Sequence, residues 1–125
     1  MAIELQGFKI TAIAGETQTS SQFLAMRFTA EMTVMGITQT GKVSCGVLQN
    51  DPHSGGGSEI MVSGLTKVVQ GASVAAGALI TVGAAASVIG VASGCYSVGQ
   101  MALNGGASAA IGSALISCFA PNYMV

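Results

Sequence analysis

The sequence predicts an all-β protein, a small single-domain β-barrel or β-tulip-like fold of short strands with glycine-rich turns. Three observations support this prediction. A chain of 125 residues has the length of one domain. Its apolar residues come in short runs, and its 18 glycines fall largely between those runs. Short apolar runs separated by glycine are typical of strands and turns, whereas a helix needs a longer stretch with a 3.6-residue period.

Ten segments have the composition of strands, at the close spacing that is typical of barrels and sandwiches. The first alternates apolar and polar side chains as a half-buried strand does. We therefore expect residues 1–20 to form an N-terminal strand or arm, and residues 21–125 to form the barrel domain. The ten segments are residues 3–13, 23–29, 32–37, 42–48, 59–62, 65–69, 78–82, 88–92, 97–103 and 114–119.

A loop and a repeat organise the middle of the chain. Between residues 48 and 59, Pro52 fixes φ and a run of three glycines has no side chain to pack, so we expect an exposed tip. GVLQN at 46–50 followed by GSEIMVS at 57–63 resembles GQMALN at 99–104 followed by GSALIS at 112–117. We interpret this repeat, with a period of 53–55 residues, as two similar hairpins packed in one barrel.

Charge is scarce and unevenly placed. Only 7% of the residues are charged, and no charged residue follows Lys67. Soluble monomers carry about 25% charged residues, so a long neutral segment indicates a surface that a neighbour covers. We expect a homotrimer whose subunit interface includes apolar residues of this segment. The residues expected there are Val82, Val88, Ile89 and Val91.

Two binding partners are disfavoured by the same composition. Four scattered basic residues and a net charge of −1 form no stripe that could neutralise phosphates, so we expect no nucleic acid as partner. Residues 68–98 are apolar and long enough to span a membrane. Their five glycines would cost a helix about 5 kcal/mol, however, and no basic residue follows to anchor the far end. We expect no membrane contact, and a membrane-embedded or pore-forming protein using residues 68–98 is the alternative.

The sequence shows no catalytic constellation. The single histidine, His53, lies in the glycine-rich loop without a second ligand at metal-binding spacing. Cys45, Cys95 and Cys118 form no CxxC pair, which favours reduced, structural thiols. We therefore expect no enzyme, no metal and no cofactor. The first residues also show no basic-then-apolar export signal.

One segment of the chain resembles a known family. GVLQNDPHSGGGSEIMVSGLTKVVQGASVAAGALITV at 46–82 is similar to the running pattern of the small phage capsid decoration, or cement, proteins, a domain of unknown function found in head-gene clusters. The likeness extends over about residues 23–119. The stretch VGAAASVIG at 82–90 departs from it, because family members place a charged turn there. The matching positions are Gly46, Val47, Leu48, Gln49, Asn50, Pro52, Val62, Gly64, Lys67, Val68, Gly71, Val74, Gly77, Leu79, Ile80 and Thr81.

The resemblance implies a structural virion protein that binds the outside of an assembled capsid and stabilises the shell. It implies the major capsid protein as partner, a trimer as the common state, and a place on the capsid exterior after assembly in the host cytoplasm. The N-terminal segment is then either a capsid-binding arm that adds to a sheet edge of the shell, or an ordinary first strand. The apolar residues expected to contact the capsid are Ile3, Leu5, Phe8, Ile10 and Ile13.

Overall fold

The computed structural model describes residues 7–118 and 122–123, and all regular structure in these residues is strand. The expectation of an all-β fold is therefore confirmed. Residues 59–62 and 65–69 belong to one continuous strand, so the two separate strands expected there were wrong. The strands are β1 (Phe8–Ala14), β2 (Ala25–Ala30), β3 (Thr33–Gly36), β4 (Gly46–Leu48), β5 (Gly57–Val69), β6 (Leu79–Val82), β7 (Val88–Gly90), β8 (Tyr96–Ser97), β9 (Gly99–Leu103), β10 (Ile111–Ser117) and β11 (Asn122–Tyr123).

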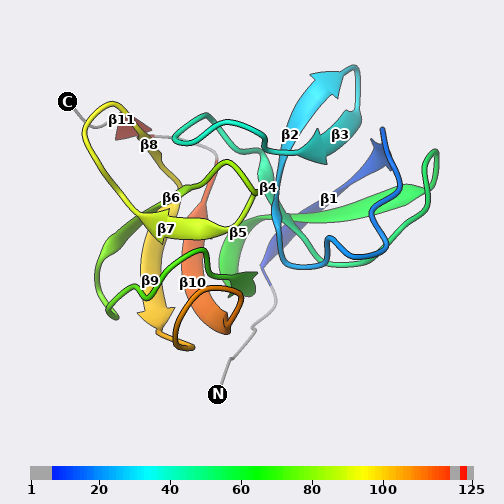
Figure 1. Cartoon of the computed structure of the whole chain (residues 1–125). Helices are drawn as coiled ribbons and strands as arrows, with labels where there is room; N and C mark the ends of the chain where they lie inside the picture. The colour runs from blue at the N-terminus through cyan, green and yellow to red at the C-terminus, as the bar shows by residue number, and fades with distance from the viewer. Residues whose placement is uncertain (1–6, 119–121, 124–125) are drawn as a thin grey trace.

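Nine of these strands form one sheet, in the order β1-β3-β2-β4-β5-β10-β9-β6-β7, and β8 pairs with β11. β1 also pairs with β5, which closes β1, β3, β2, β4 and β5 into a ring. On the other side, a bridge between Gln70 and Val88 brings β7 back to the end of β5. The arrangement is ring-like, and the single barrel expected from the sequence is not formed. Figure 1 shows β5 running from the group of β1, β2 and β3 to the group of β6, β9 and β10.

The two rings are copies of one unit. We call β1–β4 with residues 57–63 of β5 the N-terminal half-unit, and residues 63–69 of β5 with β6, β7, β9 and β10 the C-terminal half-unit. β2 pairs with β3 and β4 as β6 pairs with β7 and β9, antiparallel in each case. β4 pairs with β5 as β9 pairs with β10. The parallel contact of β1 with β3 has its counterpart in the parallel bridge between Gln70, which follows β5, and Val88 of β7.

Backbone hydrogen bonds repeat between the half-units at an offset of 53 to 56 residues. The Phe23 N–H donates to the Leu48 carbonyl at 2.7 Å, and the Gly77 N–H donates to the Met101 carbonyl at 2.7 Å. The hairpins suspected from the sequence are β4–β5 and β9–β10. They are therefore parts of a larger repeat that covers most of the described chain.

Small aliphatic side chains and methionine fill two core clusters. The smaller one lies within the N-terminal half-unit, around Met26, Leu48 and Ile60. The larger one joins residues of both half-units, since Val47 and Met61 pack there with residues of β6, β9 and β10. The half-units therefore share a core and cannot separate without exposing it to water.

No helix in the described residues is long and apolar enough to cross a membrane. The apolar stretch 68–98 instead holds the end of β5 and the strands β6, β7 and β8. Turns separate these strands at several of the glycines that the sequence places between its apolar runs.

We predict that alanine at Gly46 and at its counterpart Gly99 destabilises the fold to a similar extent. Both glycines have positive φ, +152° and +155°. A Cβ at Gly46 would overlap the Met61 carbonyl, and one at Gly99 would overlap the Leu115 carbonyl. Backbone strain of this kind costs roughly 1–3 kcal/mol before the overlap is added. Urea unfolding of Gly46→Ala and Gly99→Ala measures the loss.

Gly90→Ala is the matched control, because a Cβ there meets no atom within 4 Å. Its midpoint should stay at or above the wild-type value. Equal midpoints for all three variants would contradict the close approach at Gly46 and Gly99.

Candidate functional site

The cysteines do not form a reactive site. Burial and, to a smaller extent, the neighbouring Cys118 raise the pKa of Cys45 to about 12, against a backbone hydrogen bond that lowers it. Burial raises the pKa of Cys118 to about 11, against a hydrogen bond from Ser44 that lowers it. Both thiols are thus protonated near neutral pH, and only the thiolate is a strong nucleophile.

His53 belongs to no metal-binding cluster in the described residues. His53 is exposed in the loop between β4 and β5. In residues 7–118 and 122–123, no three His, Cys, Asp or Glu side chains are grouped closely enough to hold a metal ion.

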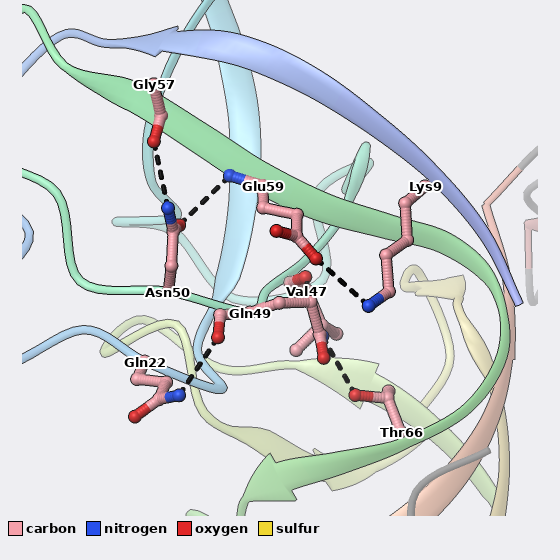
Figure 2. A network of polar contacts seen from close by, with 8 residues as sticks. All are labelled: Lys9, Gln22, Val47, Gln49, Asn50, Gly57, Glu59 and Thr66. Carbon is pink, nitrogen blue, oxygen red and sulfur yellow. Dashed lines mark hydrogen bonds and ion pairs between the residues drawn. The ribbon is translucent and has the colours of Figure 1, made fainter. Parts of the chain in front are cut away.

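A polar network supports the β4–β5 hairpin (Figure 2). Asn50 donates through Nδ2 to the Gly57 carbonyl at 2.9 Å and accepts the Glu59 N–H at 3.0 Å. Lys9 pairs with Glu59 at 3.0 Å, which ties β1 to the same hairpin. These bonds fix the base of the loop. They use the polar groups internally, so the network is structural.

The residues expected to contact a capsid fall into three groups. Ile3 and Leu5 lie outside the described residues. Ile10 is half-buried and packs against the smaller core cluster. Phe8 and Ile13 are exposed, by 54% and 50%. β1 pairs with both β5 and β3, so from Phe8 onward the segment is a strand of this chain's own sheet.

An exposed apolar row runs along the strands that flank β5. Phe8 lies opposite Ser63 and Ile13 opposite Gly57, both on β5. Leu115 is 54% exposed and Ile111 39% exposed, and both belong to β10, which continues along β5. Partners directly opposite in a sheet point to the same face. We call Phe8, Ile13, Ile111 and Leu115 the β5 row.

The expected subunit interface is only partly accessible. Val82 and Val88 are buried in the larger core cluster and contribute to this chain's own packing. Ile89 and Val91 are half-buried, so they retain surface that a neighbour could contact.

A groove beside β2 was not expected from the sequence. It has a volume of about 450 Å³ and is lined by Arg27, Phe28, Val43, Ser44, Cys45 and Cys118. Phe28 and Val43 are 47% and 46% exposed. A smaller hollow of about 220 Å³ shares Arg27 and also includes Lys42. The groove therefore combines apolar side chains with the cationic Arg27, and Lys42 lines the hollow that shares Arg27 with it.

Comparison with known proteins gives a likeness in fold. No protein-family model and no curated protein matches the sequence. Among solved structures, the chain is similar to the N base of the head fiber gp8.5 of bacteriophage phi29, with a TM-score of 0.65 and 14% sequence identity. The likeness covers 88% of this chain and 93% of that chain. At this identity it shows a shared fold.

We predict that the protein loses stability as the pH rises above about 9, because of Cys45 and Cys118. Their pKa values are about 12 and about 11 in the folded chain, against 9.0 for an unperturbed thiol. Above about pH 9 the unfolded chain releases thiol protons that the folded chain retains, which favours unfolding. Below that pH both states are protonated, so the contribution to stability is fully present.

Urea midpoints measured between about pH 7 and pH 10 test this prediction. The double variant Cys45→Ala, Cys118→Ala is the control for lysine and tyrosine titration, and its midpoint should fall less steeply. Identical slopes for the two proteins would refute the assignment.

Proposed function

We propose that this chain is a structural protein of a phage-type virion, which binds the outside of the assembled capsid and stabilises the shell without catalysis. The observation that carries the proposal is the fold shared with a phage head fiber base over 88% of the chain. The pattern of residues 46–82, which resembles capsid decoration proteins, supports the same role. The major capsid protein is the proposed partner, and a homotrimer on the capsid exterior is the proposed state.

The β5 row is the surface that we assign to the shell. Four large apolar side chains are exposed on strands that pair with one continuous strand, so they are held on a rigid support. Burying each of them stabilises a contact by roughly 1.5–3 kcal/mol at most. A trimer presents three such rows, so that the combined binding far exceeds that of a single row.

In this proposal β1 contacts the shell with its side chains and does not add to another sheet. Main-chain pairing with a foreign edge would require β1 to leave β5 and β3. The hydrogen bonds that β1 loses with β5 and β3 would then offset those that it gains with the foreign strand. Phe8 and Ile13 remain the proposed capsid contacts within the described part of the segment.

We predict that Phe8→Lys combined with Leu115→Lys reduces binding to cognate capsids at least tenfold and leaves folding intact. Both side chains are more than half exposed, so charge is tolerated in the free protein. It is costly in a contact that excludes water. Co-sedimentation with purified capsids gives the affinity, and circular dichroism checks the strand content.

Thr29→Lys on β2 is the control, because Thr29 is exposed away from the β5 row. It should bind like wild type. If the double variant binds capsids as tightly as wild type, the β5 row is not the capsid-binding surface. If the wild-type protein itself does not bind capsids, the proposed function is wrong.

A further inference from the structure

The two half-units are joined by a loop of the first that docks on the second. Gly41, in the loop between β3 and β4, donates its N–H to the Val82 carbonyl at 2.8 Å. Its own carbonyl accepts the Tyr96 N–H at 2.8 Å. Gly41 is buried in this position, and a Cβ there would lie 2.6 Å from the Cys95 Sγ. A docked loop therefore needs glycine at its tip.

The repeat identifies the counterparts of this contact. Gly94 corresponds to Gly41 at an offset of 53 residues, and the two have φ values of +85° and +79°. Gly41 lies in the loop before β4, and Gly94 lies in the loop before β8, which leads directly into the equivalent strand β9. The Met26 carbonyl accepts the Cys45 N–H, as the Ile80 carbonyl accepts the Val98 N–H. Two residues further along β2 and β6, Phe28 corresponds to Val82. Two residues before Cys45 and Val98, Val43 corresponds to Tyr96.

The N-terminal half-unit has a corresponding site at Phe28 and Val43, on which no described loop is docked. We call such a docking site a seat. Val82 is fully buried under the Gly41 loop, whereas Phe28 is 47% exposed. Phe28 and Val43 line the groove of about 450 Å³ beside β2, at the place that corresponds to the site of Gly41. In the described part of the chain, no loop backbone bonds to Phe28 or Val43 as Gly41 bonds to Val82 and Tyr96.

The loop of the C-terminal half-unit is correspondingly undocked. Residues 92–94 are all exposed, in contrast to the buried Gly41. Among residues 7–118 and 122–123, one seat is therefore occupied, one seat has no loop docked on it, and the 92–94 loop is undocked.

A second contact between the half-units also has exposed residues as its counterparts. The Ala25 N–H donates to the Ala86 carbonyl at 2.8 Å, and both residues are buried. Their counterparts are Leu79 and Met32, which are 42% and 52% exposed. Large apolar side chains thus lie in water where the equivalent residues of the other half-unit are covered.

We propose that the empty seat at Phe28 and Val43 binds the 92–94 loop of a second copy of this chain. The partner's Gly94 donates its N–H to the Phe28 carbonyl, and its carbonyl accepts the Val43 N–H. Leu79 of one copy approaches Met32 of the next. The neutral loop meets Arg27 and Lys42 without like-charge repulsion, because no charged residue follows Lys67 in the sequence.

This contact is head-to-tail, so each copy donates one loop and accepts one. Such contacts close into a ring when the rotation between copies allows, as in a trimer, and otherwise extend into a filament. The inference rests on the proposed self-association and names the surfaces that produce it. It makes no use of the capsid.

Two variants test the proposal with the protein alone. Val43→Lys places a charge in the seat, at a position that is 46% exposed and therefore tolerant. Gly94→Asn adds a side chain at the loop tip, where asparagine accepts positive φ. Each variant should be monomeric at concentrations at least tenfold above those at which wild type assembles, by sedimentation velocity. Mixed together, they should form a one-to-one dimer and nothing larger, because one supplies an intact loop and the other an intact seat.

Ser108→Lys is the matched control, since Ser108 is exposed in the loop between β9 and β10 and its counterpart Ser54 is exposed as well. It should assemble like wild type. The proposal is overturned if wild type is monomeric at millimolar concentration, if both variants assemble normally, or if their mixture stays monomeric. Failure of assembled wild-type protein to bind capsids would instead count against the function proposed above and leave this result unaffected.

Discussion

The fold depends on one constraint, the continuity of β5 through both half-units. Its 13 residues pair with β1 in their first part and with β10 in their second. The change of partner occurs beside Gly64, where a Cβ would lie 2.9 Å from the Cα of Gly7. Because Gly7 and Gly64 have no side chains, the beginning of β1 can lie close to β5 at the point where the pairing of β5 changes to β10. Since neither ring can close without this strand, the half-units fold as one body.

The composition follows from this architecture. Two small rings enclose little volume each, so Ala, Val, Ile and Met fill them, and aromatic residues make up only 5% of the chain. Strands that approach one another closely need glycine at positive φ, as at Gly46 and Gly99 in β4 and β9. Such a chain has little charged surface, and the exposed apolar residues concentrate at the β5 row and at the counterparts of buried contacts between the half-units.

The sequence predicted the strands well and their relations less well. Apolar runs and glycines located β2, β3, β6 and β9 to within a few residues, because both signals are local. Residues 59–62 and 65–69 were expected to be separate strands, although Gly64 between them is a crossing point inside β5. Val82 and Val88 were expected at a subunit interface, but an apolar residue of a strand looks the same whether its own core or a neighbour covers it. Phe28 and Val43 were not identified as binding residues, because the sequence does not show that they are exposed. Only the comparison of the two half-units shows that their counterparts Val82 and Tyr96 contact a docked loop.

In our proposal, Gly41 and Gly94 are the same structural element, docked once within the chain and once between chains. Amide hydrogen exchange of these two residues, followed by NMR from dilute to concentrated protein, tests this claim most directly. The Gly41 N–H bonds to Val82 in every chain, so the account predicts slow exchange at all concentrations. The Gly94 N–H is predicted to exchange rapidly in dilute protein and slowly once the protein assembles. Rapid exchange at Gly94 in the assembled protein would contradict the account.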